Sequence, residues 1–281
     1  MKWTVLPSQE DSSVTFVLPS EEGNIETRYV RRNDEYFIVY LSSHACQSNN
    51  KQIYFEPVTI DMYLEQALRV FSHYDGIVDE QRAVKRVFFN WMAMGDVLSN
   101  PHFINDGSTL LGCLKCIARE RGLSSKFNVS TILPIELKHG LVAPFKGLPI
   151  DFYYSLYSMN ETFRKRWIPN GTPVKQSLQM LSEWQKSENR EVVLHWAFIK
   201  GENDSEVDVN AVCDAVEAHG LKVRINLVRY NPPNDKSSES CAETIEKNLG
   251  IIQYRLSDKS KIVPLVGKDI FASCGQFFVG D

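Results

Sequence analysis

The sequence predicts an α/β fold in which parallel strands alternate with helices. Short runs rich in β-branched and aromatic residues alternate with longer stretches whose apolar residues recur at helical spacing, and about six such units fit into the chain. At 281 residues with 43% hydrophobic residues, the chain is long enough to bury a large core. We therefore expect a single domain over residues 1–281, with helical crossovers joining the strands of a parallel sheet.

The first strand and helix are expected between residues 36 and 74. The run YFIVYL (36–41) is typical of a buried strand and leads into the polar residues 42–44. Apolar residues then recur at broadly helical spacing, which predicts an amphipathic helix over Thr59–Tyr74 with Thr59 as its N-cap.

The later units repeat this pattern. We expect strands at 86–92, 126–133, 152–157, 192–199 and 222–230, helices at 110–121, 173–187 and 207–219, and a short final strand from Ile251 (IIQYRL). Trp91 and Trp196 are expected in the core because they occupy strands. The periodicity fits a barrel and an open doubly wound sheet equally, and in both folds ligands bind beyond the carboxyl ends of the strands.

The net charge and the cysteine content of the sequence bear on which classes of protein it can belong to. With 31 basic and 35 acidic residues the net charge is −4, so the sequence-wide basic footprint of a non-specific DNA or RNA binder is absent. Two local basic clusters, Arg28 with Arg31 and Arg32, and Arg164–Arg166, fit either a basic groove or a solvated charged face. Six cysteines in a chain of this length indicate reduced thiols. Because the sequence has neither a leader pattern nor a long apolar run, we expect a soluble cytoplasmic protein without a membrane segment.

A series of segments, in order along the chain, resembles the radical S-adenosylmethionine (SAM) methylases that modify adenine in ribosomal and transfer RNA. The segments are NIETRYV (24–30), YLSSHAC (40–46), FFNWMAMGDVLSN (88–100), NVSTIL (128–133), SLYSMNETFRKRWIP (155–169), HWAFIKGENDS (195–205), INLVRYNPP (225–233) and ASCGQF (272–277). The resemblance covers about residues 24–278, and ASCGQF is its most specific part. A single short match would be weak, whereas an ordered series along the chain is specific.

This resemblance implies a partial (β/α)6 parallel barrel, with residues 1–35 as an N-terminal extension and 256–281 as a C-terminal tail over the site. It implies SAM as the cofactor, RNA as the substrate and, in an active enzyme, a flavodoxin-like reductase as electron donor. Glu26 matches the family's proton acceptor and Cys274 its methyl-accepting cysteine. The residues implied to bind SAM are Gly95, Asp96, Ser130, Ser155, Tyr157 and Asn231.

The segment after Cys46 departs from the family's pattern. In the family, three cysteines spaced C-x3-C-x2-C hold a [4Fe-4S] cluster, and Cys46 matches the first of them. The other two positions hold Asn50 and Ile53, and one thiolate cannot hold the cluster. Either the cluster loop is deleted or a loop is missing from this sequence, so the cluster is expected only if further cysteine ligands exist. The family's resolving cysteine is replaced in the region of Tyr40 and Leu41.

Several residues fit more than one interpretation. Cys113 and Cys116 form a C-x2-C pair that suits either a metal site or two small buried side chains. Cys274 fits a methyl acceptor or an ordinary tail cysteine, and Glu26 and Asp96 fit site residues or solvated and capping carboxylates. Three functions stay open: a radical SAM enzyme that transfers a methyl or other group to RNA or a smaller substrate, a protein that binds SAM, a nucleotide or RNA without a cluster, and a structural role.

Overall fold

The computed structural model describes residues 2–20, 23–31, 33–49, 52–78, 83–137, 139–232 and 235–270. The chain divides into two compact units, Met1–Ser130 with Val266–Asp281, and Thr131–Leu265. Each unit is an α/β structure and is described by itself. That the whole chain acts as one domain stays a prediction.

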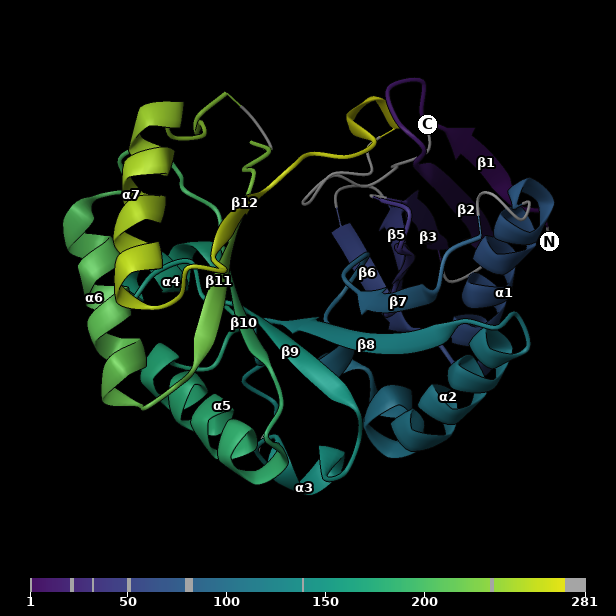
Figure 1. Ribbon diagram of the computed structural model, residues 1–281, viewed down its shortest axis with the longest axis horizontal. Coiled ribbons are helices and arrows are strands. Elements are labelled where there is room, and N and C mark those ends of the chain that lie inside the picture. Colours follow the sequence, from purple (N-terminus) through teal and green to yellow (C-terminus); the bar gives the residue numbers. More distant parts are fainter. Residues whose placement is uncertain are drawn as a thin grey trace. The chain divides into compact units, whose positions relative to one another are not determined.

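The first unit combines eight strands with two long helices (Figure 1). Its strands are β1 (Thr4–Pro7), β2 (Val14–Ser20), β3 (Gly23–Arg31), β4 (Tyr36–Leu41), β5 (His44–Asn49), β6 (Gln52–Pro57), β7 (Arg86–Trp91) and β8 (Ser124–Thr131). Its helices are α1 (Ile60–Ile77) and α2 (Pro101–Arg119), with short 3₁₀ turns η1 (Val97–Ser99) and η2 (Lys268–Ile270). The predicted strands at 36–41 and 86–92 and the helices after them are confirmed.

The sheet of the first unit has an antiparallel and a parallel part. Strands β1, β2, β3 and β4 pair antiparallel in that order, so residues 4–31, within the expected N-terminal extension, add three strands beside β4. Strands β4, β7 and β8 pair parallel. Because α1 connects β4 to β7 and α2 connects β7 to β8, this part consists of the strand–helix–strand units that the sequence predicted.

Helices α1 and α2 cover one face of these parallel strands. Phe37 of β4 contacts Phe71 of α1, and Trp91 of β7 contacts Phe103 of α2. Phe89 stacks on Phe127 of β8 on the same face, with ring centroids 5.5 Å apart. Since successive side chains of a strand point to opposite faces, the residues between these rings lie on the face away from the helices.

The second unit, in teal to yellow in Figure 1, alternates strands with helices. It contains α3 (Val142–Phe145), β9 (Ile150–Ser155), α4 (Glu161–Trp167), α5 (Val174–Glu188), β10 (Val192–Trp196), α6 (Glu206–Ala218), β11 (Val223–Val228), α7 (Ala242–Arg255) and β12 (Lys261–Val263). Strands β9, β10, β11 and β12 pair parallel in that order, as predicted for 152–157, 192–199 and 222–230.

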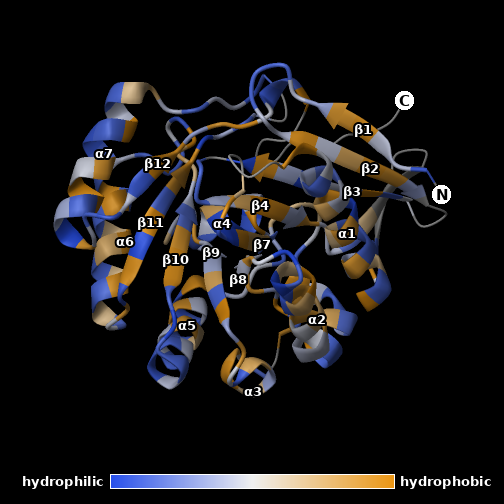
Figure 2. Ribbon diagram, turned by 45° about the vertical axis from the view of Figure 1, so that its right-hand side comes forward, coloured by the Kyte–Doolittle hydropathy of each residue, from blue (hydrophilic) through white to orange (hydrophobic). Residues whose placement is uncertain are grey.

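The strands of the second unit also have an apolar and a polar face. Phe152 of β9 packs edge-on against Trp184 of α5, and Trp196 is fully buried, as predicted. Tyr153, His195 and Arg224 occupy alternate positions and lie on the other face. Along β11, hydrophobic and hydrophilic residues alternate, and Figure 2 shows them as orange and blue stretches.

The predicted strand at Ile251 is wrong, because these residues form the second half of α7. The run IIQYRL is β-branched and aromatic, which favours a strand locally. However, Ile245 and Ile252 are spaced by two helical turns and both are buried, so packing of one helical face outweighs the local preference.

The basic clusters and the cysteine pair also differ from expectation. Arg28 and Arg164 are both buried, so neither takes part in a solvated face, while Arg32 lies outside the described residues. Cys116 and Cys241 are exposed, whereas Cys213 is buried as expected for a small apolar side chain. Among the described helices, none has the length and apolar character needed to cross a membrane.

Candidate functional site

In the first unit the loops that follow β4 and β7 are joined by backbone hydrogen bonds. The N–H groups of Ser43 and His44 both donate to the carbonyl of Met94, over 2.7 and 3.3 Å. The N–H of Ala93 donates to the carbonyl of Leu41 over 3.3 Å. The two loops therefore form one small platform at the carboxyl ends of parallel strands, where ligands bind in α/β folds.

Ser42 fixes this platform to its surroundings. Its hydroxyl donates to the carbonyl of Glu26 over 2.5 Å and accepts from the N–H of Met94 over 3.2 Å. Its backbone N–H and carbonyl both bind the side chain of Gln66 in α1. Ser42 therefore joins β3, β4, α1 and the loop after β7.

Gly95, in the loop after β7, lies against the side chain of His44. Its φ of +79° is in the left-handed region, and a Cβ placed on it would lie 2.3 Å from Nδ1 of His44. Only glycine satisfies both the backbone conformation and the close approach. Burial of His44 lowers the pKa of its imidazole, which favours the neutral ring beside Gly95.

Asp96 follows directly and caps the 3₁₀ turn η1. Its Oδ1 accepts a hydrogen bond of 2.9 Å from the N–H of Leu98, and its side chain is half-buried. The capping role that the sequence left open for this carboxylate is therefore present. Gly95 and Asp96 lie in the loop that follows the carboxyl end of β7, and their role in binding SAM stays a prediction.

Asn100 is a structural residue of this platform that the sequence reasoning did not identify. Its Oδ1 caps α2 by accepting from the N–H groups of His102 and Phe103. Its Nδ2 donates to the carbonyls of Ser43 and Val58, over 2.7 and 2.9 Å, and lies 3.2 Å from the hydroxyl of Tyr63. The dipeptide Asn100-Pro101 is a sequence signal for the start of a helix, so the cap was predictable. The bonds from Nδ2 were not, because Ser43, Val58 and Tyr63 are distant from Asn100 in the sequence.

Glu26 is buried and paired with Arg28 two residues further along β3. The two side chains are 3.0 Å apart, and both lie on the face away from α1. The solvated role that the sequence left open for Glu26 is excluded, because the carboxylate is fully buried. Ser130 is half-buried at the carboxyl end of β8.

The backbone around Cys46 forms a β-hairpin. Cys46 lies in β5, opposite Phe55 of β6, and it also pairs with Asn24 of β3. Asn49 pairs with Gln52, so only two residues connect the strands. In the part of the chain that the structure describes, no group of three His, Cys, Asp or Glu side chains is placed to hold a metal ion. Cys274 lies outside the described residues.

In the second unit the segment after β9 is held by Asn203. Asn203 Nδ2 donates to the carbonyls of Tyr157 and Ala197, over 2.7 and 3.0 Å, and its Oδ1 accepts from the N–H of Ile199. Tyr157 has a φ of +57°, which is uncommon for a residue with a side chain. Asn203 therefore joins the carboxyl ends of β9 and β10, a role that the sequence reasoning missed.

The other expected residues of this unit lie at or near the same strand ends. Ser155 is the last residue of β9 and pairs with His195, and Asn231 follows β11 in the segment after Tyr230. Glu239 holds that segment, because its carboxylate accepts from the N–H of Tyr230 and pairs with Arg229. Ser155 and Asn231 are both half-buried.

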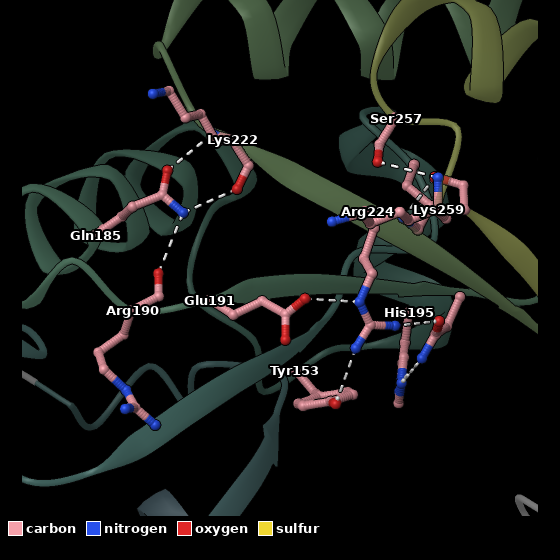
Figure 3. A network of polar contacts seen from close by, with 12 residues as sticks. Tyr153, Gln185, Arg190, Glu191, His195, Lys222, Arg224, Ser257 and Lys259 are labelled. Atoms are coloured by element: carbon pink, nitrogen blue, oxygen red, sulfur yellow. Dashed lines mark hydrogen bonds and ion pairs between the residues drawn. The ribbon is translucent and has the colours of Figure 1, made fainter.

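A polar network lies on the helix-free face of β9, β10 and β11 (Figure 3). Arg224 donates to Glu191, Asn226 and the hydroxyl of Tyr153. Nε2 of His195 lies 3.5 Å from Nδ2 of Asn226, so it acts as the acceptor of a neutral ring. Burial, with Arg224 nearby, lowers the pKa of His195 to about 4. His195 therefore offers a hydrogen-bond acceptor without adding a second positive charge beside Arg224 at neutral pH.

Comparison with known proteins gives the chain a family context. It is 26% identical over 209 residues to a probable RNA methyltransferase of Rhodopseudomonas palustris, covering 70% of this chain and 53% of that protein. It is 30% identical over 126 residues to the dual-specificity RNA methyltransferase RlmN of Azorhizobium caulinodans, covering 43% of this chain and 30% of that protein. The chain thus spans about half the length, or less, of these curated relatives. No family model matches it.

Solved structures share the fold. A crystal structure of a radical SAM methyltransferase from Sphaerobacter thermophilus superposes with a TM-score of 0.77 at 19% identity, covering 98% of this chain and 80% of that one. HydG, a maturase of the [FeFe]-hydrogenase, superposes with a TM-score of 0.56 at 12% identity, covering 82% of this chain and 52% of that one. The predicted partial α/β barrel of radical SAM type is thereby confirmed. The chain is thus similar in sequence to RNA methyltransferases and in fold to a radical SAM methyltransferase.

Proposed function

We propose that this protein is a SAM-dependent RNA-modifying protein of the radical SAM family, which transfers a methyl or other group to RNA or a smaller substrate. The observation that carries the proposal is the likeness to RNA methyltransferases over 70% of the chain, together with the ordered segments at the strand ends. RNA is the substrate class that the names of the relatives support. A flavodoxin-like reductase as partner and a cytoplasmic location remain part of the proposal.

SAM is proposed to bind at the carboxyl ends of the strands. Gly95 is exposed in the loop after β7, so that a ligand can approach its backbone, and Asp96 supplies a carboxylate for the amino group of SAM. Ser130 supplies a hydroxyl at the end of β8. For the second unit taken by itself, the resemblance implies Ser155, Tyr157 and Asn231 as SAM-binding residues.

The family's [4Fe-4S] cluster does not fit the residues of this chain. Cys46 is the only thiol between the start of the chain and Cys113, and the positions of the second and third ligands hold Asn50 and Ile53. A side-chain amide and an aliphatic chain cannot replace thiolates on iron. The described residues on either side of this point, His44–Asn49 and Gln52–Pro57, pair as the β5–β6 hairpin.

The hairpin favours a second candidate, a protein that binds SAM, a nucleotide or RNA without a cluster. Binding of this kind needs the platform of Ser42, Gly95 and Asn100 and the strand-end residues, but no iron. Group transfer by radical chemistry would instead need thiolates from residues outside this sequence.

Anaerobic reconstitution with iron and sulfide, followed by incubation with SAM and a strong reductant, distinguishes the two candidates. If the protein is an enzyme of the family, it should retain iron and sulfide after reconstitution and show the visible absorption of an iron–sulfur cluster. It should also release 5′-deoxyadenosine from SAM. A folded protein that retains no iron contradicts radical transfer. Calorimetry with SAM and short RNA then tests the binding candidate, which fails if neither ligand gives heat.

A further inference from the structure

A row of polar side chains crosses the sheet of the first unit on the face away from α1 and α2. Register pairs Thr15 with Arg28, Arg28 with Tyr40, Tyr40 with Asn90, and Asn90 with Asn128. All five positions therefore lie side by side across β2, β3, β4, β7 and β8. An apolar row would be expected at this depth of a sheet if the face served packing alone.

Asn90 and Asn128 form the end of this row and bind each other. Nδ2 of Asn128 donates to Oδ1 of Asn90 over 2.7 Å. Asn128 is only 2% exposed, and among the described residues its Oδ1 has no hydrogen-bond partner. If both side-chain amides are rotated by 180°, Nδ2 and Oδ1 exchange places in each residue. The hydrogen bond then runs from Asn90 to Asn128, and Nδ2 of Asn128 becomes the buried atom without a partner. A buried amide of this kind is costly, so its presence requires an explanation.

The position of Asn128 connects it to the proposed SAM site. Ser130 lies two residues further along β8, so both side chains point to the same face, about 7 Å apart along the strand. Asn90 likewise precedes the loop of Gly95 and Asp96 by a few residues on β7. Asn128 therefore lies two residues before Ser130 on the same face, and Asn90 lies on the strand that leads into the loop of Gly95 and Asp96.

The chemistry of the amide limits what it binds. Asn128 has given one Nδ2 hydrogen to Asn90 and keeps an acceptor oxygen and a second donor hydrogen on one planar group. An adenine edge offers the complement, an amino group beside a ring nitrogen, and asparagine binds that edge through two hydrogen bonds. Within the proposed function, on which this inference rests, adenine is present both in SAM and in RNA.

We propose that the amide of Asn128, oriented by Asn90, binds the adenine edge of a ligand held at the carboxyl ends of β7 and β8. The proposal assigns a subsite for a neutral, planar, hydrogen-bonding group. Its source is either SAM or an RNA adenine, and the experiment below separates these two.

The test compares Asn128→Leu with the wild type of the full chain. Calorimetry measures binding of SAM, adenosine and inosine, and fluorescence anisotropy measures binding of labelled oligo-A and oligo-U. We expect the wild type to prefer adenosine over inosine, and Asn128→Leu to lose about ten- to a hundredfold in affinity for the adenine ligand together with that preference. Weakened SAM binding identifies SAM as the source, and weakening confined to oligo-A identifies RNA.

Thermal melting separates this role from a structural one. Asn128→Leu removes an unpaired buried oxygen but also leaves Oδ1 of Asn90 without its donor, so we expect a melting temperature close to that of the wild type. Asn248→Leu is the matched control: Asn248 is buried in α7 and donates to the carbonyl of Asp204, so its loss should lower stability and leave adenine binding unchanged. An adenosine preference that survives in Asn128→Leu overturns the subsite. A wild type that binds none of the ligands overturns the proposed function itself, and the subsite with it.

Discussion

Gln66 and Ser42 hold each other through two hydrogen bonds. The N–H of Ser42 donates to Oε1 of Gln66 over 2.8 Å, and Nε2 of Gln66 donates to the carbonyl of Ser42 over 3.0 Å. Both residues are buried, so a single side chain of α1 supplies both backbone hydrogen bonds of the residue that follows β4. Helix and strand are thereby fixed together at the edge that carries the candidate site.

Gln66→Leu should destabilise the protein by roughly 2–4 kcal/mol, because it leaves two buried backbone groups without partners. Gln185 provides a matched control, since it makes the same pair of hydrogen bonds with the backbone of Lys222, at a position open to water (Figure 3). Gln185→Leu should cost about 1 kcal/mol or less, because water replaces the lost bonds. Urea unfolding measures both, and equal losses would contradict the role assigned to Gln66.

Asn100→Ala should be more damaging than an ordinary loss of a helix cap. Asn160 caps α4 with the same two hydrogen bonds that Asn100 makes to α2, but it is exposed and its amide nitrogen has no comparable buried role. We expect about 1 kcal/mol of destabilisation for Asn160→Ala and roughly 3–5 kcal/mol for Asn100→Ala, which also leaves buried carbonyls unpaired. Thermal unfolding compares the two variants, and similar melting temperatures would show that the amide nitrogen of Asn100 contributes little.

Gly95→Ala should impair both stability and SAM binding. An alanine at a φ of +79° is strained by about 1 kcal/mol, and its Cβ would also displace His44. Gly122→Ala isolates the first effect, because Gly122 has a φ of +70° and nothing lies within 4 Å of its Cβ position. Calorimetry with SAM should find wild-type affinity in Gly122→Ala and a loss of at least roughly tenfold in Gly95→Ala. Unchanged SAM affinity in Gly95→Ala would remove this turn from the site.

Acid should destabilise the fold in part through His195. Its pKa is lowered from 6.5 to about 4, mainly by burial, so the folded state favours the neutral ring. The stabilisation is complete above pH 6.5 and is lost as the pH falls towards 4, with a total of about 3 kcal/mol. His195→Gln should flatten the pH dependence of the unfolding free energy over this range, measured by urea titration at several pH values. The same substitution at the exposed His139 is the control, and equal slopes in wild type and His195→Gln would contradict the account.

Most of the strands and helices were predictable from the sequence, because the spacing of apolar residues within each segment indicates its secondary structure. Thr59 accepts from the N–H of Met62 as an N-cap should, and Trp91 lies in the core. The helix at Ile251 was missed because the burial of its partner Ile245 decides between helix and strand, and burial is a tertiary property.

The candidate site was predictable only in outline. The residues after each strand were correctly placed at or near the strand ends, but the amides that hold the loops were not identified. Asn100 binds the carbonyl of Ser43, 57 positions away, and Asn203 binds the carbonyl of Tyr157, 46 positions away. Contacts of this range leave no periodic signal in a single sequence. The polar row that ends in Asn128 became visible only through strand register.

Calorimetric titration of the folded chain with SAM tests the central claim most directly. We predict saturable binding at a single site, weakened roughly tenfold or more by Asp96→Asn, which removes the charge proposed to hold the amino group of SAM. A folded wild-type protein that gives no heat with SAM, or an Asp96→Asn variant that binds SAM as tightly as the wild type, would contradict it.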